Sequence, residues 1–144
     1  MSALPFAAIV RQRAGDRCEY CRMHQSLQGA TFHVEHIQPE VHGGLTELEN
    51  LAWACPGCNL RKSDRMRLRD PGTEQLVRFF DPRHDDWSEH FSWEVFRVSG
   101  LTSIGRAMVQ GLDLNHLRRQ RIRQAEQTFG LFEGDPESFE AAGP

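Results

Sequence analysis

The chain has 144 residues, 39% of them hydrophobic and 26% charged, which suits one globular domain over residues 1–144 and excludes two of ordinary size. No apolar run approaches the roughly 18 residues of a membrane helix, and residues 4–10 have no positive charge before them, so we expect a cytoplasmic protein without a membrane span or signal peptide. The net charge of −3 argues against a polyanionic partner on average, yet five of the six charged residues in 59–69 and all four in 118–123 are basic, which leaves room for a local basic surface.

The first half of the chain predicts a helix followed by a strand. The helix begins near Pro5, which suits a first helical turn, and ends at Gly15. Its apolar stripe comprises Phe6, Ile9 and Val10, with Arg13 on the same face. Residues 31–37 are rich in strand formers and stop before a proline, so they predict a strand.

A turn, a second strand and a second helix follow. Gly43-Gly44 predicts the turn, and Thr46 with Glu49 matches a capping box for a short helical turn ending at Asn50. Residues 51–54 predict an apolar strand, and the charged, proline-free residues 59–69 predict a helix. The order is strand, loop, strand, helix.

Residues 79–130 predict a C-terminal hairpin with helices. The aromatic stretch 79–99, with alternation at Phe91, Trp93 and Val95, predicts a β-hairpin. A helix over residues 103–112 follows. Asn115 is expected to cap a last helix. The side chains expected to face inward there are Leu117, Ile122, Ala125 and Phe129, and those expected to face outward are Arg118, Arg119, Arg121 and Arg123. The acidic residues 131–144 are expected to fray.

The four cysteines form two pairs, Cys18-x-x-Cys21 and Cys55-x-x-Cys58. Two such pairs with no cysteine left over predict a structural zinc site with four thiolate ligands. Two disulfides would need an oxidising compartment, and a thioredoxin-like redox role would need only one of the pairs. We therefore expect Zn²⁺ to staple the fold.

Four polar residues lie between and just after these pairs: Glu35, His36, Asn50 and Asn59. A carboxylate, an imidazole and a carboxamide oxygen held close together can bind a hard divalent cation and activate a water molecule. Each residue alone is weak evidence, because a strand histidine is more often structural and an asparagine before a helix is usually a cap.

The motifs CEYC, HVEHIQPEVHGG and ELENLAWACPGCNLRKS together resemble the HNH endonuclease family, in its branch with two CxxC knuckles. The resemblance implies an α+β protein with a ββα-metal (HNH, or His-Me finger) core over residues 18–70. It also implies DNA as the substrate, hydrolysed at phosphodiester bonds to leave a 5′-phosphate. The catalytic cofactor implied is one divalent ion, Mg²⁺ or Mn²⁺, in addition to the structural Zn²⁺.

The resemblance also assigns roles. His36 matches the general base, Glu35 and Asn59 match the metal ligands, and Asn50 matches the asparagine that fixes the loop and orients the base. Lys62, Arg61 and Arg65 are candidates to grip DNA phosphates, and a solvated helix face is the alternative for them.

Two features complicate this assignment. Glu35 stands where aspartate is more usual, and strand alternation points Glu35 and His36 to opposite faces. His33 shares the face of Glu35 and is either a plain structural residue or an additional group near the metal. A zinc-stapled nucleic-acid-binding module without catalysis is the main alternative function, and a structural zinc domain for protein contacts is the third. With one site per chain, a double-strand cut needs a homodimer or two successive nicks.

Overall fold

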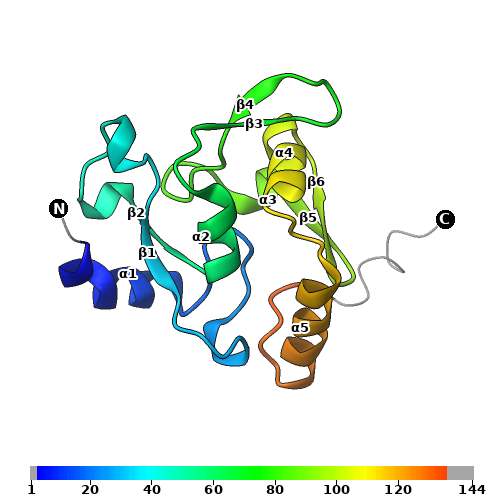
Figure 1. Cartoon of the computed structure of the whole chain (residues 1–144). Coiled ribbons are helices and arrows are strands. Elements are labelled where there is room, and N and C mark those ends of the chain that lie inside the picture. The colour runs from blue at the N-terminus through cyan, green and yellow to red at the C-terminus, as the bar shows by residue number, and fades with distance from the viewer. Residues whose placement is uncertain (1–2, 136–144) are drawn as a thin grey trace.

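The computed structural model describes residues 3–135 and shows short antiparallel hairpins alternating with helices, an α+β arrangement (Figure 1). The helices are α1 (Ala7–Ala14), α2 (Pro56–Lys62), α3 (Trp87–His90), α4 (Ser103–Gly111) and α5 (Leu117–Thr128). The strands are β1 (His33–His36), β2 (Leu51–Ala54), β3 (Arg67–Arg69), β4 (Leu76–Arg78), β5 (Phe91–Glu94) and β6 (Arg97–Gly100). Consecutive strands pair in three two-stranded sheets. No helix within residues 3–135 is long and apolar enough to cross a membrane.

The β1–β2 hairpin and α2 form the centre of the fold, and α1 packs against the hairpin (Figure 1). Glu35 lies opposite Ala52 and His36 opposite Leu51 in the antiparallel register. All four residues of β2 are buried, as its apolar sequence predicts. The predicted order of strand, loop, strand and helix is therefore confirmed.

Helix α1 ends as predicted, at Gly15, whose positive φ of 64° suits a residue without a side chain. Its buried face is rotated from the expected one, however. Val10 and Ala14 are buried, whereas Ile9 is 51% exposed. The helix faces β2 along the i, i+4 row through Val10 and Ala14, which leaves Ile9 on the flank.

The helix predicted over residues 59–69 is wrong at both ends. Helix α2 begins at Pro56 and ends at Lys62, and Ser63 follows with a φ of 49°. Residues 67–69 form β3, which pairs with β4 and buries only its central Leu68. The alternation of buried leucine with exposed arginines is that of a strand, and the charged run concealed it.

The turn between β3 and β4 is held by Asp70, which is fully buried. Its carboxylate accepts hydrogen bonds from the Gly72 N–H at 2.9 Å and the Thr73 hydroxyl at 2.9 Å. Arg106 of α4 donates two more, at 3.0 and 2.8 Å. The β3–β4 hairpin is thereby attached to α4.

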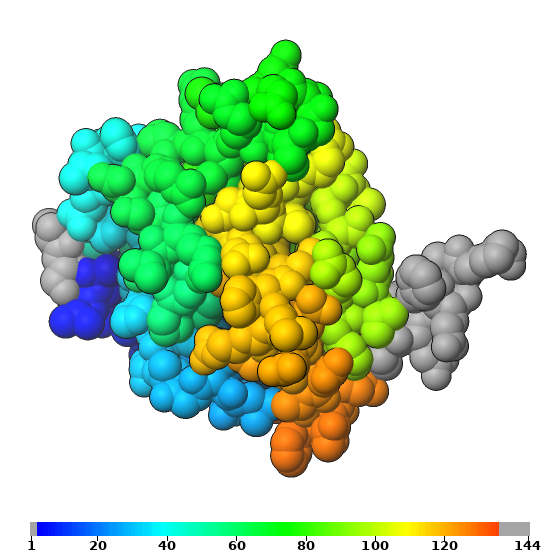
Figure 2. Space-filling view, turned by 45° about the vertical axis from the view of Figure 1, so that its right-hand side comes forward, coloured from blue at the N-terminus to red at the C-terminus, as the bar shows by residue number. Residues whose placement is uncertain are grey.

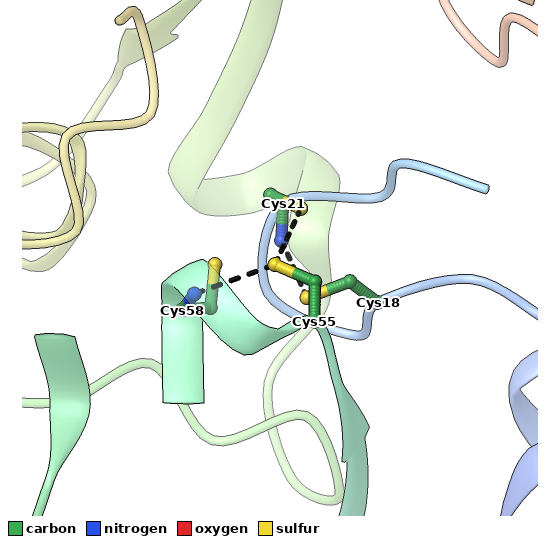
Figure 3. Close-up of side chains that lie close together, drawn as sticks. All are labelled: Cys18, Cys21, Cys55 and Cys58. Carbon is green, nitrogen blue, oxygen red and sulfur yellow. Dashed lines mark hydrogen bonds between the residues drawn. The ribbon is translucent and has the colours of Figure 1, made fainter. Parts of the chain in front are cut away.

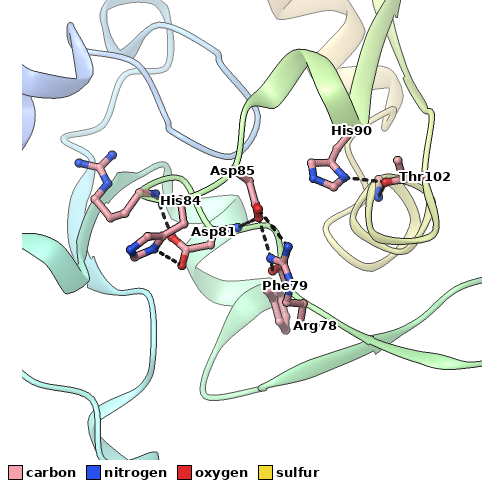
Figure 4. A network of polar contacts seen from close by, with 9 residues as sticks. Arg78, Phe79, Asp81, His84, Asp85, His90 and Thr102 are labelled. Carbon is pink, nitrogen blue, oxygen red and sulfur yellow. Dashed lines mark hydrogen bonds and ion pairs between the residues drawn. The ribbon is translucent and has the colours of Figure 1, made fainter.

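A polar network fixes the segment between β4 and α3, which has no regular secondary structure (Figure 4). Arg78 donates to both carboxylate oxygens of Asp85, at 2.6 and 2.9 Å. His84 bonds Asp81 at 2.9 Å, and the Asp81 N–H donates to Asp85 at 2.8 Å. These side chains replace the backbone pairing that a helix or strand would supply.

The aromatic hairpin is confirmed as β5–β6, preceded by the short helix α3. The Trp87 ring packs against both Phe91 and Trp93, with centroids 4.9 and 5.1 Å away. Val95 was expected to continue the strand, but it lies in the hairpin turn with a φ of 58°.

The acidic end of the chain is attached over its described part. The Phe132 ring packs on Trp93 with 5.1 Å between centroids, and Glu133 forms an ion pair with Arg22 at 2.8 Å. Fraying is therefore wrong for residues 131–135. The expectation for residues 136–144 lies outside the described residues.

Helix α4 has the predicted inner face, with Ala107, Met108 and the following Leu112 buried. Helix α5 follows the prediction only in part: Arg118 and Arg121 are exposed and Ile122 packs against the core as expected, but the buried face is rotated from the predicted one. Its buried residues are Arg119, Arg123 and Glu126, while Leu117 is 57% and Phe129 68% exposed.

Hydrogen bonds explain why the buried face of α5 differs from the predicted one. Arg123 donates to the carbonyls of Phe96 and Leu114 at 2.9 and 2.7 Å, and Glu126 accepts from the His24 N–H at 2.7 Å. Asn115 is not the cap, because its carboxamide bonds both backbone groups of Val98. The His116 ring caps the helix instead.

Candidate functional site

The four cysteines converge as expected of a zinc site (Figure 3). Cys18 and Cys21 come from the loop after α1, and Cys55 and Cys58 from the start of α2. All four are buried, and their sulfur atoms lie within 4.8 Å of one another. The sulfur atoms of Cys21 and Cys55 are 3.8 Å apart.

These spacings fit tetrahedral zinc, whose bonds of about 2.3 Å to sulfur place the ligands about 3.8 Å apart. Each knuckle also donates a backbone N–H to its own sulfur, from Cys21 to Cys18 at 3.5 Å and from Cys58 to Cys55 at 3.3 Å. Within residues 3–135 this is the one close group of three or more His, Cys, Asp or Glu ligand atoms. The predicted cysteine set is thus assembled and could hold Zn²⁺.

Arg119 of α5 contacts this site, donating from Nη1 to the Cys58 sulfur at 3.3 Å. Burial alone would lower the pKa of Arg119, but the thiolates of Cys58, Cys21 and Cys55 raise it above its ordinary value. The guanidinium supplies positive charge beside the four cysteines, whose thiolates would give a zinc centre a net negative charge. Sequence reasoning placed Arg119 in solvent and missed this contact.

A separate cleft of about 280 Å³ lies between β1, the turn at residues 39–41 and the end of α2. Glu35, His36 and Asn59 all line it, so the structure brings together three of the four predicted catalytic residues. Glu40 and Asp64, which the sequence did not single out, add two carboxylates to the lining.

Glu35 points inward from β1 and is only 6% exposed. One carboxylate oxygen lies 3.1 Å from the Lys62 ammonium nitrogen, and the other accepts a hydrogen bond from the Tyr20 hydroxyl. Burial raises the pKa of Glu35, and the charge of Lys62 acts in the opposite direction. Tyr20 lies between the two cysteines of the first knuckle, so the zinc site fixes one partner of this carboxylate.

His36 lies on the opposite face of β1 from Glu35, as alternation predicts, and its side chain is 16% exposed. Its Nε2 is 2.9 Å from the Thr46 hydroxyl and 3.4 Å from a Glu40 carboxylate oxygen. If Nε2 carries the proton, the Nδ1 lone pair is left to accept one. Thr46 was expected in a capping box, but the turn Leu48–Asn50 has no side-chain cap and Thr46 bonds His36 instead.

Asn50 ties the loop between the strands together. Its carboxamide oxygen accepts from the Gln38 N–H at 2.8 Å, and its nitrogen donates to the carbonyls of Gln38 and Leu45 at 3.0 and 2.9 Å. Leu45 precedes Thr46, so Asn50 indirectly positions the hydroxyl that meets His36. Asn59, by contrast, makes no side-chain hydrogen bond with residues 3–135, which leaves its carboxamide free in the cleft.

The structure does not support Lys62 as a DNA contact. Lys62 is 1% exposed, and besides Glu35 its ammonium group bonds the carbonyls of His36 and Ile37 at 3.0 and 2.9 Å. It holds the end of β1 against α2. Arg61 and Arg65 reach solvent, with Arg61 37% exposed. His33 is exposed and does not line the cleft.

Residues 18–65 match the family model described as HNH endonuclease. No curated protein and no solved structure matches the chain significantly. The matched segment, 48 of the 144 residues, contains the four cysteines, the β1–β2 hairpin, α2 and every residue predicted to be catalytic. The resemblance of this segment to the HNH endonuclease family is therefore confirmed.

Proposed function

We propose that the protein is a metal-dependent endonuclease that hydrolyses DNA phosphodiester bonds. The observation that carries this proposal is the cleft of the HNH domain, which gathers the imidazole of His36, the carboxylate of Glu35 and the unbonded carboxamide of Asn59. These are the groups that water activation and a hard divalent ion require.

His36 acts as the general base. The Glu40 carboxylate, 3.4 Å from Nε2, favours the form with a proton there, and the Thr46 hydroxyl can accept a hydrogen bond from that form. Nδ1 then accepts the proton of the water that attacks the scissile phosphorus. Asn50 fixes the loop that carries Thr46, and so keeps the ring oriented.

Glu35 and Asn59 hold the divalent ion. Carboxylate and carboxamide oxygens are hard ligands, which favours Mg²⁺ or Mn²⁺ over softer ions. Lys62 and Tyr20 each engage one oxygen of Glu35, and a carboxylate oxygen can accept more than one partner. When bound, the ion would stabilise negative charge on the phosphate and the leaving 3′-oxygen.

A nucleic-acid-binding domain without catalysis is the second candidate. The observation that favours it is the Glu35–Lys62 ion pair, because the charge of this carboxylate is already balanced. The two candidates differ in whether added Mg²⁺ or Mn²⁺ leads to broken phosphodiester bonds.

The test is cleavage of supercoiled plasmid by zinc-loaded protein, with Mg²⁺, with Mn²⁺ and with no added divalent ion. We expect relaxed circles that need the added ion, and a loss of at least about 100-fold in rate for His36→Ala. His33→Ala is the matched control, because this exposed histidine on the same strand lies outside the cleft.

Three results would decide against the proposal. Cleavage by His36→Ala at the wild-type rate would show that His36 is not the general base. Equal loss in His33→Ala would point to damage of the strand. Retarded but intact plasmid would favour the binding domain. If relaxed circles precede linear plasmid, single chains nick successively, whereas linear plasmid from the outset would indicate a homodimer.

A further inference from the structure

A second hollow, of about 240 Å³, shares no lining residue with the catalytic cleft. It is bounded by the loop around residues 23–28, the start of α2 and the start of α5, which meet on the face shown in Figure 2. Arg61, His116, Arg118 and Arg119 line it together with Cys55, and none of its lining residues carries a carboxylate. In a protein with a net charge of −3, this is a concentrated basic site.

Arg119 contributes a buried donor that has no acceptor. The residue is 6% exposed, and its Nη1 is used by the Cys58 sulfur. Its Nη2 is buried and makes no hydrogen bond among the described residues. Leaving such a group unpaired costs free energy, so an orphaned guanidinium nitrogen next to a hollow indicates a missing acceptor.

Arg61 converges on the same point, above Gly57. A Cβ at position 57 would lie 2.9 Å from Arg119 Nη2 and 3.2 Å from Arg61 Nη1, so both guanidinium groups lie close against this glycine. Their positive charges repel each other. The carboxylate nearest to Arg61 is that of the half-exposed Asp113, at 3.9 Å, which compensates this charge weakly.

His116 and Arg118 complete the rim at the N-terminus of α5. The His116 Nδ1 accepts the Arg118 N–H at 3.0 Å, so the ring proton stands on Nε2, where it can be donated. The helix has 12 residues, and its N-terminus adds a partial positive charge. Cationic donors from two helices therefore surround one hollow.

We propose that this pocket binds a phosphate group of the nucleic-acid backbone, distinct from the phosphate cleaved beside His36. A phosphate brings the oxygen acceptors that the guanidinium groups require, and arginine binds it through paired hydrogen bonds. The adjoining hollow along α5 shares His116 and Arg118, adds Arg121 and has no acidic lining residue. The backbone of the bound strand follows these two hollows. This inference rests on the proposed function for the identity of the ligand.

The test measures binding of a labelled duplex of about 20 base pairs to the zinc-loaded full chain, without added Mg²⁺ or Mn²⁺, over a series of salt concentrations. Each phosphate contact contributes about 0.9 to the slope of log K against log salt concentration. We expect Arg118→Gln to lower this slope by about one and the affinity about fivefold. Arg97→Gln, which changes an exposed arginine outside both hollows, should leave the slope and affinity unchanged.

An unchanged slope and affinity for Arg118→Gln would show that the pocket does not bind a backbone phosphate, as would the absence of any duplex binding.

Inorganic phosphate serves as the second probe. If millimolar phosphate raises the melting temperature of the wild type but not of Arg118→Gln, while the duplex slope is the same in both, the pocket binds a small phosphate and the nucleic-acid assignment is wrong. The binding slope requires no cleavage. A wild type that binds with the full slope but never cuts plasmid would refute the nuclease and keep the pocket.

Discussion

At the scale of single residues, the Glu35–Lys62 pair connects the HNH strand to the helix. Both side chains are almost fully buried, with exposures of 6% and 1%. A buried ion pair is costly to break, because removing one partner leaves the other charge buried and uncompensated. Lys62 also donates hydrogen bonds to the carbonyls of His36 and Ile37. Its removal therefore leaves these two acceptors unpaired as well.

We therefore predict that Lys62→Met lowers the free energy of unfolding by about 3–5 kcal/mol, measured by urea denaturation of zinc-loaded protein. Arg67→Met is the control, since Arg67 is exposed and should change stability by less than about 0.5 kcal/mol. Adding Glu35→Gln to Lys62→Met should restore part of the loss, because the unpaired carboxylate is removed. Equal stability of Lys62→Met and Arg67→Met would show that the pair is not buried in solution.

Asp70 gives a pH-dependent prediction of the same kind. The hydrogen bonds from Arg106 lower the pKa of this carboxyl well below its ordinary value. A carboxyl whose pKa is lower in the folded than in the unfolded state stabilises the fold above its unfolded pKa, near 3.9, and loses this effect as pH falls toward the folded pKa. Asp70→Asn should therefore melt lower than the wild type at pH 7.

The gap in melting temperature between wild type and Asp70→Asn should narrow as pH falls below about 4. The measurement is a series of melting curves from pH 7 down to pH 3. Asp64→Asn is a suitable control, because Asp64 is exposed and has no ion pair among the described residues. A gap that stays constant with pH would mean that Asp70 contributes through shape alone.

The residue scale also shows why sequence reasoning reached only part of the site. The alternation that separates Glu35 from His36 follows from strand geometry alone and is present as expected. The burial of Lys62 does not follow from local sequence, because its partners on β1 are 25 to 27 positions away. Thr46 was missed because a capping box and a contact with His36 use the same hydroxyl.

At the scale of elements, α5 is the clearest failure of hydrophobic patterning. The pattern placed Leu117 and Phe129 inside and all four arginines outside, whereas Leu117 and Phe129 are exposed and Arg119 and Arg123 are buried. Two carbonyls for Arg123 and a thiolate for Arg119 provide acceptors that no sequence window reveals. In helix α4 the apolar pattern predicted the buried side correctly, because Ala107 and Met108 are buried there.

The burial of Arg123 in α5 leads to a direct prediction. Arg123→Met removes the donors to Phe96 and Leu114, leaves those buried carbonyls unsatisfied and should cost about 2–4 kcal/mol of unfolding free energy. Arg121→Met, two positions earlier on the exposed face, should cost less than about 0.5 kcal/mol. Urea denaturation of the two variants is the measurement. Equally small losses would restore the orientation that the apolar pattern favours, because that pattern places both arginines outside.

At the scale of the whole molecule, the first zinc knuckle touches both halves of the chain. The carbonyl of Tyr20 accepts from the Trp87 indole at 3.1 Å, and the His24 N–H just after the knuckle donates to Glu126. Arg119 reaches the second knuckle at Cys58. The C-terminal hairpin and helices, which lie outside the HNH match, are therefore packed on the metal-binding loop.

We predict from this that zinc removal unfolds both halves together. Structural zinc contributes about 10–16 kcal/mol in small sites, which is as large as the whole stability of an ordinary domain, about 5–15 kcal/mol. Without the ion, the four buried thiols would leave the loop that carries Tyr20 and His24 unsupported.

The measurement is a chelator titration in the Trp53→Phe variant, whose remaining tryptophans, Trp87 and Trp93, both lie in the aromatic hairpin region. Their emission should shift to the red over the same chelator range in which the far-ultraviolet circular dichroism is lost, and zinc should reverse both changes. A loss of circular dichroism while the tryptophan emission stays constant would instead mean that the C-terminal half folds without the zinc-binding half, and that the contacts through Tyr20 and Arg119 do not join the two halves into one cooperative unit.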